Sequence, residues 1–74
     1  MDVVSQSKLF AEELKRLRND ITKQDRIESM TSIGIKSPAT ISNYLNGKVR
    51  DNDTAAALIA FFKNRIAKRS EVLA

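Results

Sequence analysis

The chain has 74 residues and a net charge of +4, and it contains neither histidine nor cysteine. Without these residues it has no disulfide, no thiol nucleophile, no imidazole for acid–base catalysis, and none of the nitrogen and sulfur ligands that zinc usually takes. We therefore expect a protein that is not an enzyme, with no catalytic residue, no cofactor and no bound metal.

Glycine and proline, which tight turns need, are scarce, with two glycines and one proline in the sequence. The residues that favour helices, such as alanine, leucine, lysine, arginine and glutamate, are plentiful. These proportions predict an all-α fold, a compact bundle of four helices forming one domain over residues 1–74, with residues 1–4 and 70–74 flexible. The domain is either a complete protein or the N-terminal part of a longer one.

No apolar run is long enough to span a bilayer, the longest being residues 55–62. The N-terminus carries Asp2 and lacks the basic and then apolar pattern of a signal peptide. We expect a soluble, cytoplasmic protein that does not bind membranes.

The first helix is predicted at about residues 7–19. Its apolar residues recur at steps of four, three and four, at Phe10, Leu14, Leu17 and Ile21. The opposite side carries charges of both signs, which is typical of a solvated face.

The second helix is predicted at about residues 22–32. Thr22 begins it with Asp25 three residues later, an arrangement typical of a capping box. Ile27 and Met30 are expected to face the core, and Gly34 should end the helix with a positive φ angle.

The third helix is predicted at about residues 37–46, and the sequence marks both of its ends. Ser37 can cap it, Pro38 suits its first position, and Asn46-Gly47 is typical of a helix end. Ile41, Leu45 and, less clearly, Tyr44 have the spacing of an inward face. The remaining face presents small groups, most of them polar, which can fit closely against another surface.

The fourth helix is predicted at about residues 53–69, with Asp51, Asn52 or Asp53 as its cap. A wide apolar stripe runs along it and should form the main wall of the core. The stripe consists of Ala55, Ile59, Phe62, Ile66 and, less clearly, Leu73, and it is widened by Leu58, Phe61 and Arg65.

The positive charge is concentrated in the middle of the chain. Residues 22–50 carry five basic and two acidic side chains, a net charge of +3, whereas residues 1–21 are neutral overall. A local excess of this kind suits a surface that faces phosphates, because each neutralised phosphate releases counterions. Ordinary solubility charge is the alternative.

A short helix, a turn with a glycine and a second short helix with small polar residues make up a helix-turn-helix unit. The second helix of such a unit enters the major groove of DNA, where asparagine can bond adenine, serine can bond several bases and an alanine methyl can touch thymine. The predicted base-reading residues are Ala39, Thr40, Ser42 and Asn43. The predicted phosphate contacts are Thr22, Lys23, Gln24, Lys36, Ser37, Lys48 and Arg50.

Residues 39–48, Ala-Thr-Ile-Ser-Asn-Tyr-Leu-Asn-Gly-Lys, resemble the recognition helix and following turn of phage-repressor helix-turn-helix domains of the Cro and XRE-like type. The resemblance implies a compact helical bundle that binds double-stranded operator DNA as a symmetric dimer or in a larger assembly. It implies a transcriptional regulator of a phage or mobile element in a prokaryotic cell, located with the nucleoid when bound to DNA.

A closer resemblance adds residues 46–53, Asn-Gly-Lys-Val-Arg-Asp-Asn-Asp, and the helix that follows them. These are similar to the N-terminal domain of transposition ATPases typified by the B protein of phage Mu, and the likeness covers roughly residues 22–66. It implies a DNA-binding domain used in DNA transposition. The chain has no Walker-type loop, so the ATPase would lie outside it.

The chain departs from the common pattern between the two helices of the unit. It has more residues before Ile41 than the pattern, so a longer turn is expected, and Glu28 or Met30 stands where the pattern has a packed alanine. A different function is also open: a helical protein-interaction module that docks a partner through residues 55–69.

Overall fold

Four α-helices and one short 3₁₀ turn make up the structure, a computed structural model that describes the backbone of residues 3–73 and the side chains of residues 6–70. Within this range there is no strand, and the predicted all-α bundle is confirmed. The elements in chain order are α1 (Val3–Leu17), η1 (Arg18–Asp20), α2 (Lys23–Ile33), α3 (Pro38–Leu45) and α4 (Asn52–Leu73).

The outer helices are longer than the sequence predicts. The first begins at Val3 and the last continues to Leu73, so the segments expected to be flexible are helical at residues 3–4 and 70–73. Residues 1–2 and 74 of those segments lie outside the described residues.

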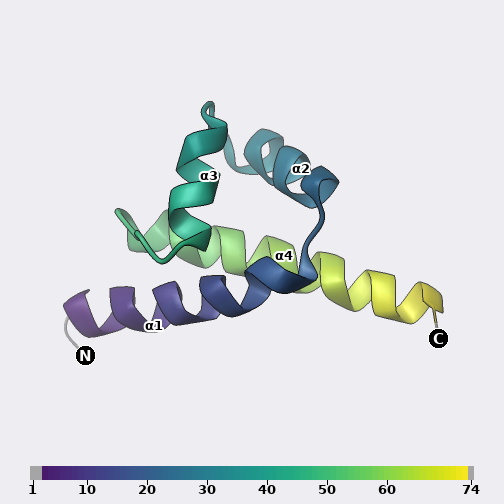
Figure 1. Ribbon diagram of the computed structural model, residues 1–74, viewed down its shortest axis with the longest axis horizontal. Helices are drawn as coiled ribbons and strands as arrows, with labels where there is room; N and C mark the ends of the chain where they lie inside the picture. The colour runs from purple at the N-terminus through teal and green to yellow at the C-terminus, as the bar shows by residue number, and fades with distance from the viewer. Residues whose placement is uncertain (1–2, 74) are drawn as a thin grey trace.

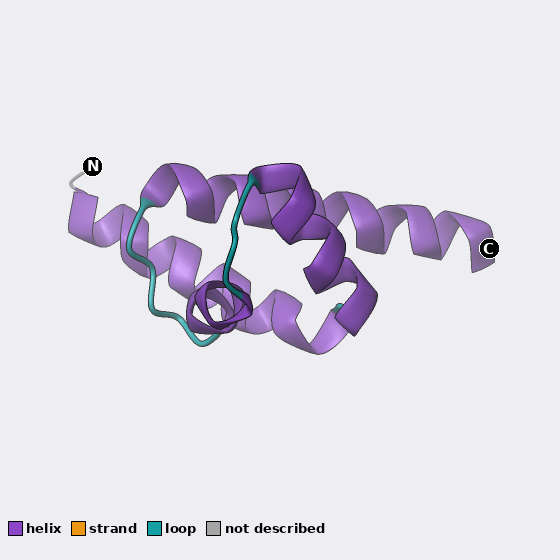
Figure 2. Ribbon diagram, turned by 90° about the horizontal axis from the view of Figure 1, so that it is seen from above, coloured by secondary structure: helices purple, strands orange, loops and turns teal. Residues whose placement is uncertain are grey.

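The two short helices, α2 and α3, pack against the two long helices, α1 and α4. α1 and α4 run side by side in the same direction, and α2 and α3 lie together on one side of this pair (Figure 1). The view from above shows that the C-terminal part of α4 extends beyond the other helices (Figure 2). The arrangement places α3 and the start of α2 on one face of the molecule.

The apolar core is built by α1, α3 and α4. Its buried members are Leu14, Leu17, Ile41, Tyr44, Leu45, Ala55, Leu58, Ile59 and Phe62. The stripes predicted on the first and last helices are confirmed, since Phe10, Ile21, Phe61 and Ile66 pack against this cluster. Burial of this surface is the main force that holds the three helices together.

The second helix uses a polar face instead. Its buried residues are Asp25 and Ser29, whereas Ile27 is 47% exposed. The prediction that Ile27 faces the core is therefore wrong, although Met30 does pack partly against it. Ile27 lies two residues from Asp25, close to the opposite side of the helix. Turning Asp25 toward α4 consequently turns Ile27 toward solvent.

The helix ends follow local chemistry in most cases. The capping box is confirmed, because the Thr22 hydroxyl accepts from the Asp25 N–H at 3.1 Å and the Asp25 carboxylate accepts from the Thr22 N–H at 3.0 Å. The capping role predicted for Ser37 is wrong: it lies at the N-cap position, but its side chain makes no capping hydrogen bond. Pro38 at the first helical position needs no such partner, since it has no N–H to satisfy.

The cap of α4 is Asp51, one of three candidates in the sequence. Its carboxylate accepts hydrogen bonds from the N–H and the hydroxyl of Thr54 at 3.0 and 2.6 Å. The hydroxyl bond of Thr54 is the main cause of a lowered pKa of Asp51. The N–H of Asp51 donates in turn to the Tyr44 hydroxyl at 3.1 Å, which ties the start of α4 to α3.

Both glycines have positive φ angles, 87° at Gly34 and 91° at Gly47. Alanine at either position is expected to lower the free energy of unfolding by about 1–2 kcal/mol, because a Cβ is strained in this region. The two losses should be similar: nothing lies near Gly34, and the end of the exposed Lys15 side chain that lies over Gly47 can move aside. Urea unfolding of the two variants provides the comparison, and no loss in either variant would contradict the strain expected at a positive φ angle.

Candidate nucleic-acid interface

The turn between α2 and α3 consists of residues 34–37. Four residues including a glycine is the ordinary length of a helix-turn-helix turn. The longer turn expected from the sequence is therefore not present, because the extra residues belong to α2. The fully buried residue of α2 is Ser29, whereas Glu28 and Met30, the two residues expected in place of the packed alanine, are half-buried. The Ser29 hydroxyl donates to the Arg26 carbonyl oxygen at 2.7 Å, so its polarity is satisfied inside the helix.

The outer face of α3 is short-chained and exposed. Ala39, Ser42 and Asn43 are all exposed and share the side of the helix opposite Ile41 and Leu45. Thr40, the fourth predicted base-reading residue, is half-buried at the edge of this face. The structure thus brings three of the four predicted residues together and places Thr40 beside them.

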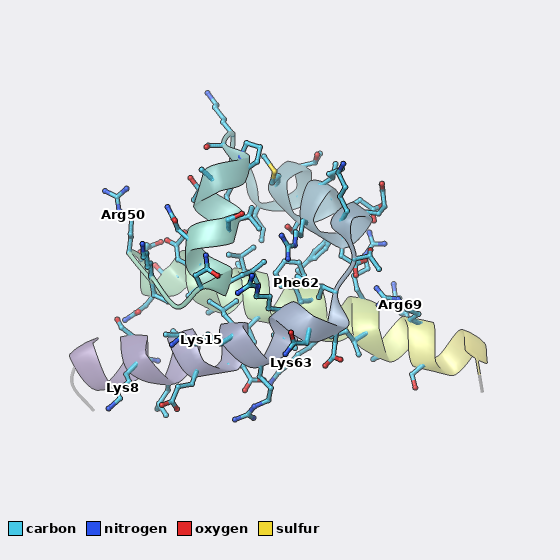
Figure 3. All side chains as sticks on the ribbon, viewed as in Figure 1. Lys8, Lys15, Arg50, Phe62, Lys63 and Arg69 are labelled. Carbon is cyan, nitrogen blue, oxygen red and sulfur yellow. The ribbon has the colours of Figure 1, made fainter. Side chains whose placement is uncertain are left out.

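The seven predicted phosphate contacts are all exposed. They are distributed around α3, with Thr22, Lys23 and Gln24 at the start of α2, Lys36 and Ser37 in the turn before α3, and Lys48 and Arg50 in the loop after it. Lys23 lines the same groove as Ser42 of α3. Arg50 lies on the side of α3 that faces away from α2 (Figure 3). Positive charge therefore flanks α3 on both sides.

The two carboxylates of residues 22–50 are held on another side of α2. Arg69 of α4 pairs with Asp25, and Arg65 pairs with Glu28 at 2.9 Å. Figure 3 shows Arg69 below α2 and remote from Arg50. None of the five basic residues in this range forms an ion pair with a residue that the structure describes: Lys23, Arg26, Lys36, Lys48 and Arg50. Charge is thereby separated across the molecule, with the acids turned to α4.

Asp25 stays ionised in its buried position. Burial by itself raises the pKa of this carboxyl, but the Thr22 backbone N–H and the Arg69 guanidinium stabilise the charged form and together hold the pKa below its ordinary value. Arg69 also donates to the Asp20 carbonyl oxygen at 2.9 Å. The negative charge of Asp25 is thus balanced within the α2–α4 contact.

Three basic residues near α3 are absent from the predicted site. Arg26 lines the groove between α2 and α3. Arg18 donates to the Asn46 side-chain oxygen at 2.8 Å, and the Lys15 side chain lies over Gly47. The end of α1 and the start of η1 therefore place cations at the C-terminal end of α3, where they also suit the negative end of its dipole.

No sequence signal marks Lys15 and Arg18, because their partners follow 28 residues or more later in the chain. Their mixed-charge setting predicts a solvated face, and only the packing of α1 under the turn after α3 brings them to the interface. Arg26 is different, since its position one turn into α2 could have been read as the same side as Lys23.

A groove of about 360 Å³ separates α2 from α3. Its apolar walls are formed by Ile27, Met30, Pro38 and Ile41. Lys23, Arg26 and Ser42 provide its polar rim. The groove adjoins the outer face of α3, so a molecule bound on that face lies beside it.

Comparison of the chain with models of protein families, with curated proteins and with solved structures finds no match. Within residues 3–73, no helix combines the length and the apolar character that a membrane crossing requires. The side chains that the structure describes contain no group of three or more aspartate, glutamate, histidine or cysteine residues positioned to hold a metal ion.

Proposed function

We propose that the protein binds double-stranded DNA, with α3 entering the major groove and the surrounding cations contacting phosphates. The separation of charge carries the proposal. Both acids of residues 22–50 pair with arginines of α4, whereas the five basic residues of the same range pair with no described residue. Solubility alone does not explain why like charges surround one short helix. Binding of a polyanion such as DNA does explain it.

The outer face of α3 has the chemistry that base edges need. Asn43 can donate to and accept from adenine, Ser42 can bond several bases, and the Ala39 methyl can contact a thymine methyl. All three side chains are short and exposed, so the helix backbone can approach the base pairs closely. Base contacts would set sequence preference, and the phosphate contacts would set position and salt dependence.

A titration of the full chain with a random DNA duplex, followed by amide shifts in NMR spectra, tests this assignment. We expect the shifts to concentrate in residues 36–50 and at the start of α2. Shifts that stay out of residues 36–50 would sink the proposal. Affinity should fall steeply with added salt, because most of the binding energy comes from phosphate contacts.

Removing one phosphate contact should weaken binding to every duplex alike. Lys48→Gln is expected to lower the affinity roughly 5- to 10-fold at moderate salt and to reduce the slope of log affinity against log salt by about 1. The matched control is Arg16→Gln, which also removes one exposed charge but from a residue paired with Glu13 at 3.5 Å on α1. Fluorescence anisotropy over a salt series measures both quantities, and equal losses in the two variants would contradict a local contact.

Removing the base-reading groups should change preference more than affinity. The double variant Ser42→Ala/Asn43→Ala is expected to lower discrimination between the preferred and a random sequence by about 1–3 kcal/mol per lost bidentate contact. The preferred sequence would first be selected from a random duplex library. A double variant that selects the same sequence with the same discrimination would show that α3 does not read bases.

The biological role and the assembly belong to the same proposal. A regulator of a phage or mobile element would bind its operator as a dimer, whereas the DNA-binding domain of a transposition ATPase would depend on a larger protein for assembly. Sedimentation of the chain with and without duplex separates these roles, because a dimeric regulator spans two half-sites about one helical turn apart.

Docking of a partner through residues 55–69 is the other function open from the sequence. Phe62 of this segment is fully buried, and Phe61 packs against the core with Arg65 over its ring at 5.0 Å. No observation on α4 favours docking over core packing, so DNA binding is the function that we propose.

A further inference from the structure

The groove between α2 and α3 combines apolar walls with a cationic rim. Ile27 is 47% exposed there, and Leu9 on α1 is the only other large apolar residue among the described side chains with comparable exposure, 53%. A soluble domain can tolerate a single exposed isoleucine. Here, however, Ile27 lines a groove together with exposed Pro38, half-buried Met30 and buried Ile41, so its exposed side chain forms part of a concave apolar surface.

Lys23 and Arg26 line the same groove and make no ion pair with the described residues. The nearest acids on α2, Asp25 and Glu28, are held by Arg69 and Arg65. A purely apolar ligand would cover these cations without neutralising them, which is costly. A phosphate alone would leave the apolar walls in water. The complementary ligand has a bulky apolar group next to carboxylates.

We propose that this groove binds a short acidic segment of a partner protein, which inserts one bulky apolar side chain against Ile27 and Pro38. Carboxylates beside that side chain pair with Lys23 and Arg26. The volume of about 360 Å³ lies at the small end of the range of ligand pockets, which suits one or two side chains and not a folded domain.

Binding of such a segment has a consequence for DNA. Lys23 and Ser42 belong both to the groove and to the surface proposed to contact DNA. The acidic segment and the duplex therefore exclude one another, and the partner releases the protein from DNA. This competition rests on the proposed DNA binding. Binding of the acidic segment to the groove does not depend on it.

A fluorescein-labelled peptide, Asp-Glu-Leu-Phe-Asp-Glu, is the probe, used with the full chain. Two control peptides replace either the Leu-Phe pair by serines or all four acids by glutamines. We expect the labelled peptide to bind about tenfold more tightly than either control, because burial of a large apolar side chain and pairing of the acids each contribute. Amide shifts should centre on Ile27, Met30 and Ser42.

Matched variants locate the site. Ile27→Ser is expected to weaken peptide binding about tenfold, whereas Leu9→Ser, which also removes an exposed apolar side chain, should leave it unchanged. Lys23→Gln should weaken binding, and Arg16→Gln should not. All four positions are exposed, so the variants should fold as the parent does, and circular dichroism confirms this.

Peptide binding that Ile27→Ser leaves unchanged, or equal binding of the serine control, would overturn the groove as the site. Absence of binding at millimolar peptide would overturn the proposal as a whole. Displacement of a labelled duplex by the unlabelled peptide supports competition, and simultaneous binding of both refutes it. If the peptide binds but no duplex does, the groove proposal stands and the DNA proposal fails. If a duplex binds but the peptide does not, the DNA proposal stands and the groove proposal fails.

Discussion

Replacing Phe62 with alanine is expected to unfold a large fraction of the protein at room temperature. Phe62 is fully buried and lies at the centre of the cluster that joins α1, α3 and α4 (Figure 3). Truncation of a buried phenylalanine costs about 3–5 kcal/mol, since the lost contacts leave a cavity. A small domain is stable by little more than about 5 kcal/mol, so this loss removes most of its stability.

Phe61→Ala is the matched control for Phe62→Ala. Phe61 is half-buried and meets Phe62 edge to face, with ring centroids 5.9 Å apart. Loss of this contact and of the Arg65 guanidinium over the ring should lower the free energy of unfolding by about 1–2 kcal/mol. Urea unfolding followed by far-ultraviolet circular dichroism measures both variants. Equal stabilities would show that the core is not centred on Phe62.

Asp25→Asn is expected to lower the free energy of unfolding by about 2 kcal/mol. Breaking a buried ion pair costs several kcal/mol, but the Arg69 side chain is 38% exposed and can recover some hydration. Asparagine keeps an oxygen for the Thr22 N–H, so the cap is weakened and not lost. The change in the free energy of unfolding therefore reports mainly the loss of the negative charge of Asp25.

Glu28→Gln provides the comparison, because Glu28, also on α2, pairs with Arg65 on α4, the helix that carries Arg69. Both side chains of that pair are partly exposed, at 36% and 39%, and such pairs contribute about 0.5 kcal/mol. We expect a clear difference between the two variants in urea unfolding. A double-mutant cycle of Asp25→Asn with Arg69→Gln should give a coupling energy well above that of the Glu28 and Arg65 pair, and equal couplings would contradict the buried pair.

The lowered pKa of Asp25 gives the same contact a pH signature. A carboxyl with a folded-state pKa below its unfolded value, about 3.9, stabilises the fold above that value. The stabilisation is lost as the pH falls through the lower folded-state pKa, because protonation removes the charge that faces Arg69. Asp25→Asn should flatten the acid limb of the stability curve, with a residual slope from Asp51, whose pKa is also lowered.

The features that the sequence predicts correctly are those whose cause is local. The capping box joins Thr22 and Asp25, three residues apart, and the positive φ of Gly34 follows from a helix that must end there. The apolar stripes of α1 and α4 are regular enough to orient both helices. The composition of the outer α3 face follows from the same periodicity, applied to Ile41 and Leu45.

The features that it misses have distant causes. The orientation of α2 depends on a partner of Asp25 that lies 44 residues further along the chain, so periodicity alone assigns Ile27 to the core. Arg18 reaches Asn46 across 28 residues, and its local sequence shows only a solvated helix. The sequence predicts too long a turn, because α2 continues to Ile33 and ends only at Gly34.

Because α2 is held to α4 through polar contacts, we expect α2 to separate from α4 at a lower free energy than the one that unfolds the core. No apolar side chain of α2 is fully buried, and its apolar contacts with the core are the half-buried Met30 and Ile33. Separation of α2 is therefore expected to need less free energy than unfolding of the whole core. Protonation of Asp25 lowers that free energy further. In acid, α2 is then the first helix to detach, while α1, α3 and α4 remain packed around Phe62. The cations at the start of α2 and the groove beside α3 would be lost together in that step, so the proposed binding is expected to end at a milder pH than helicity does.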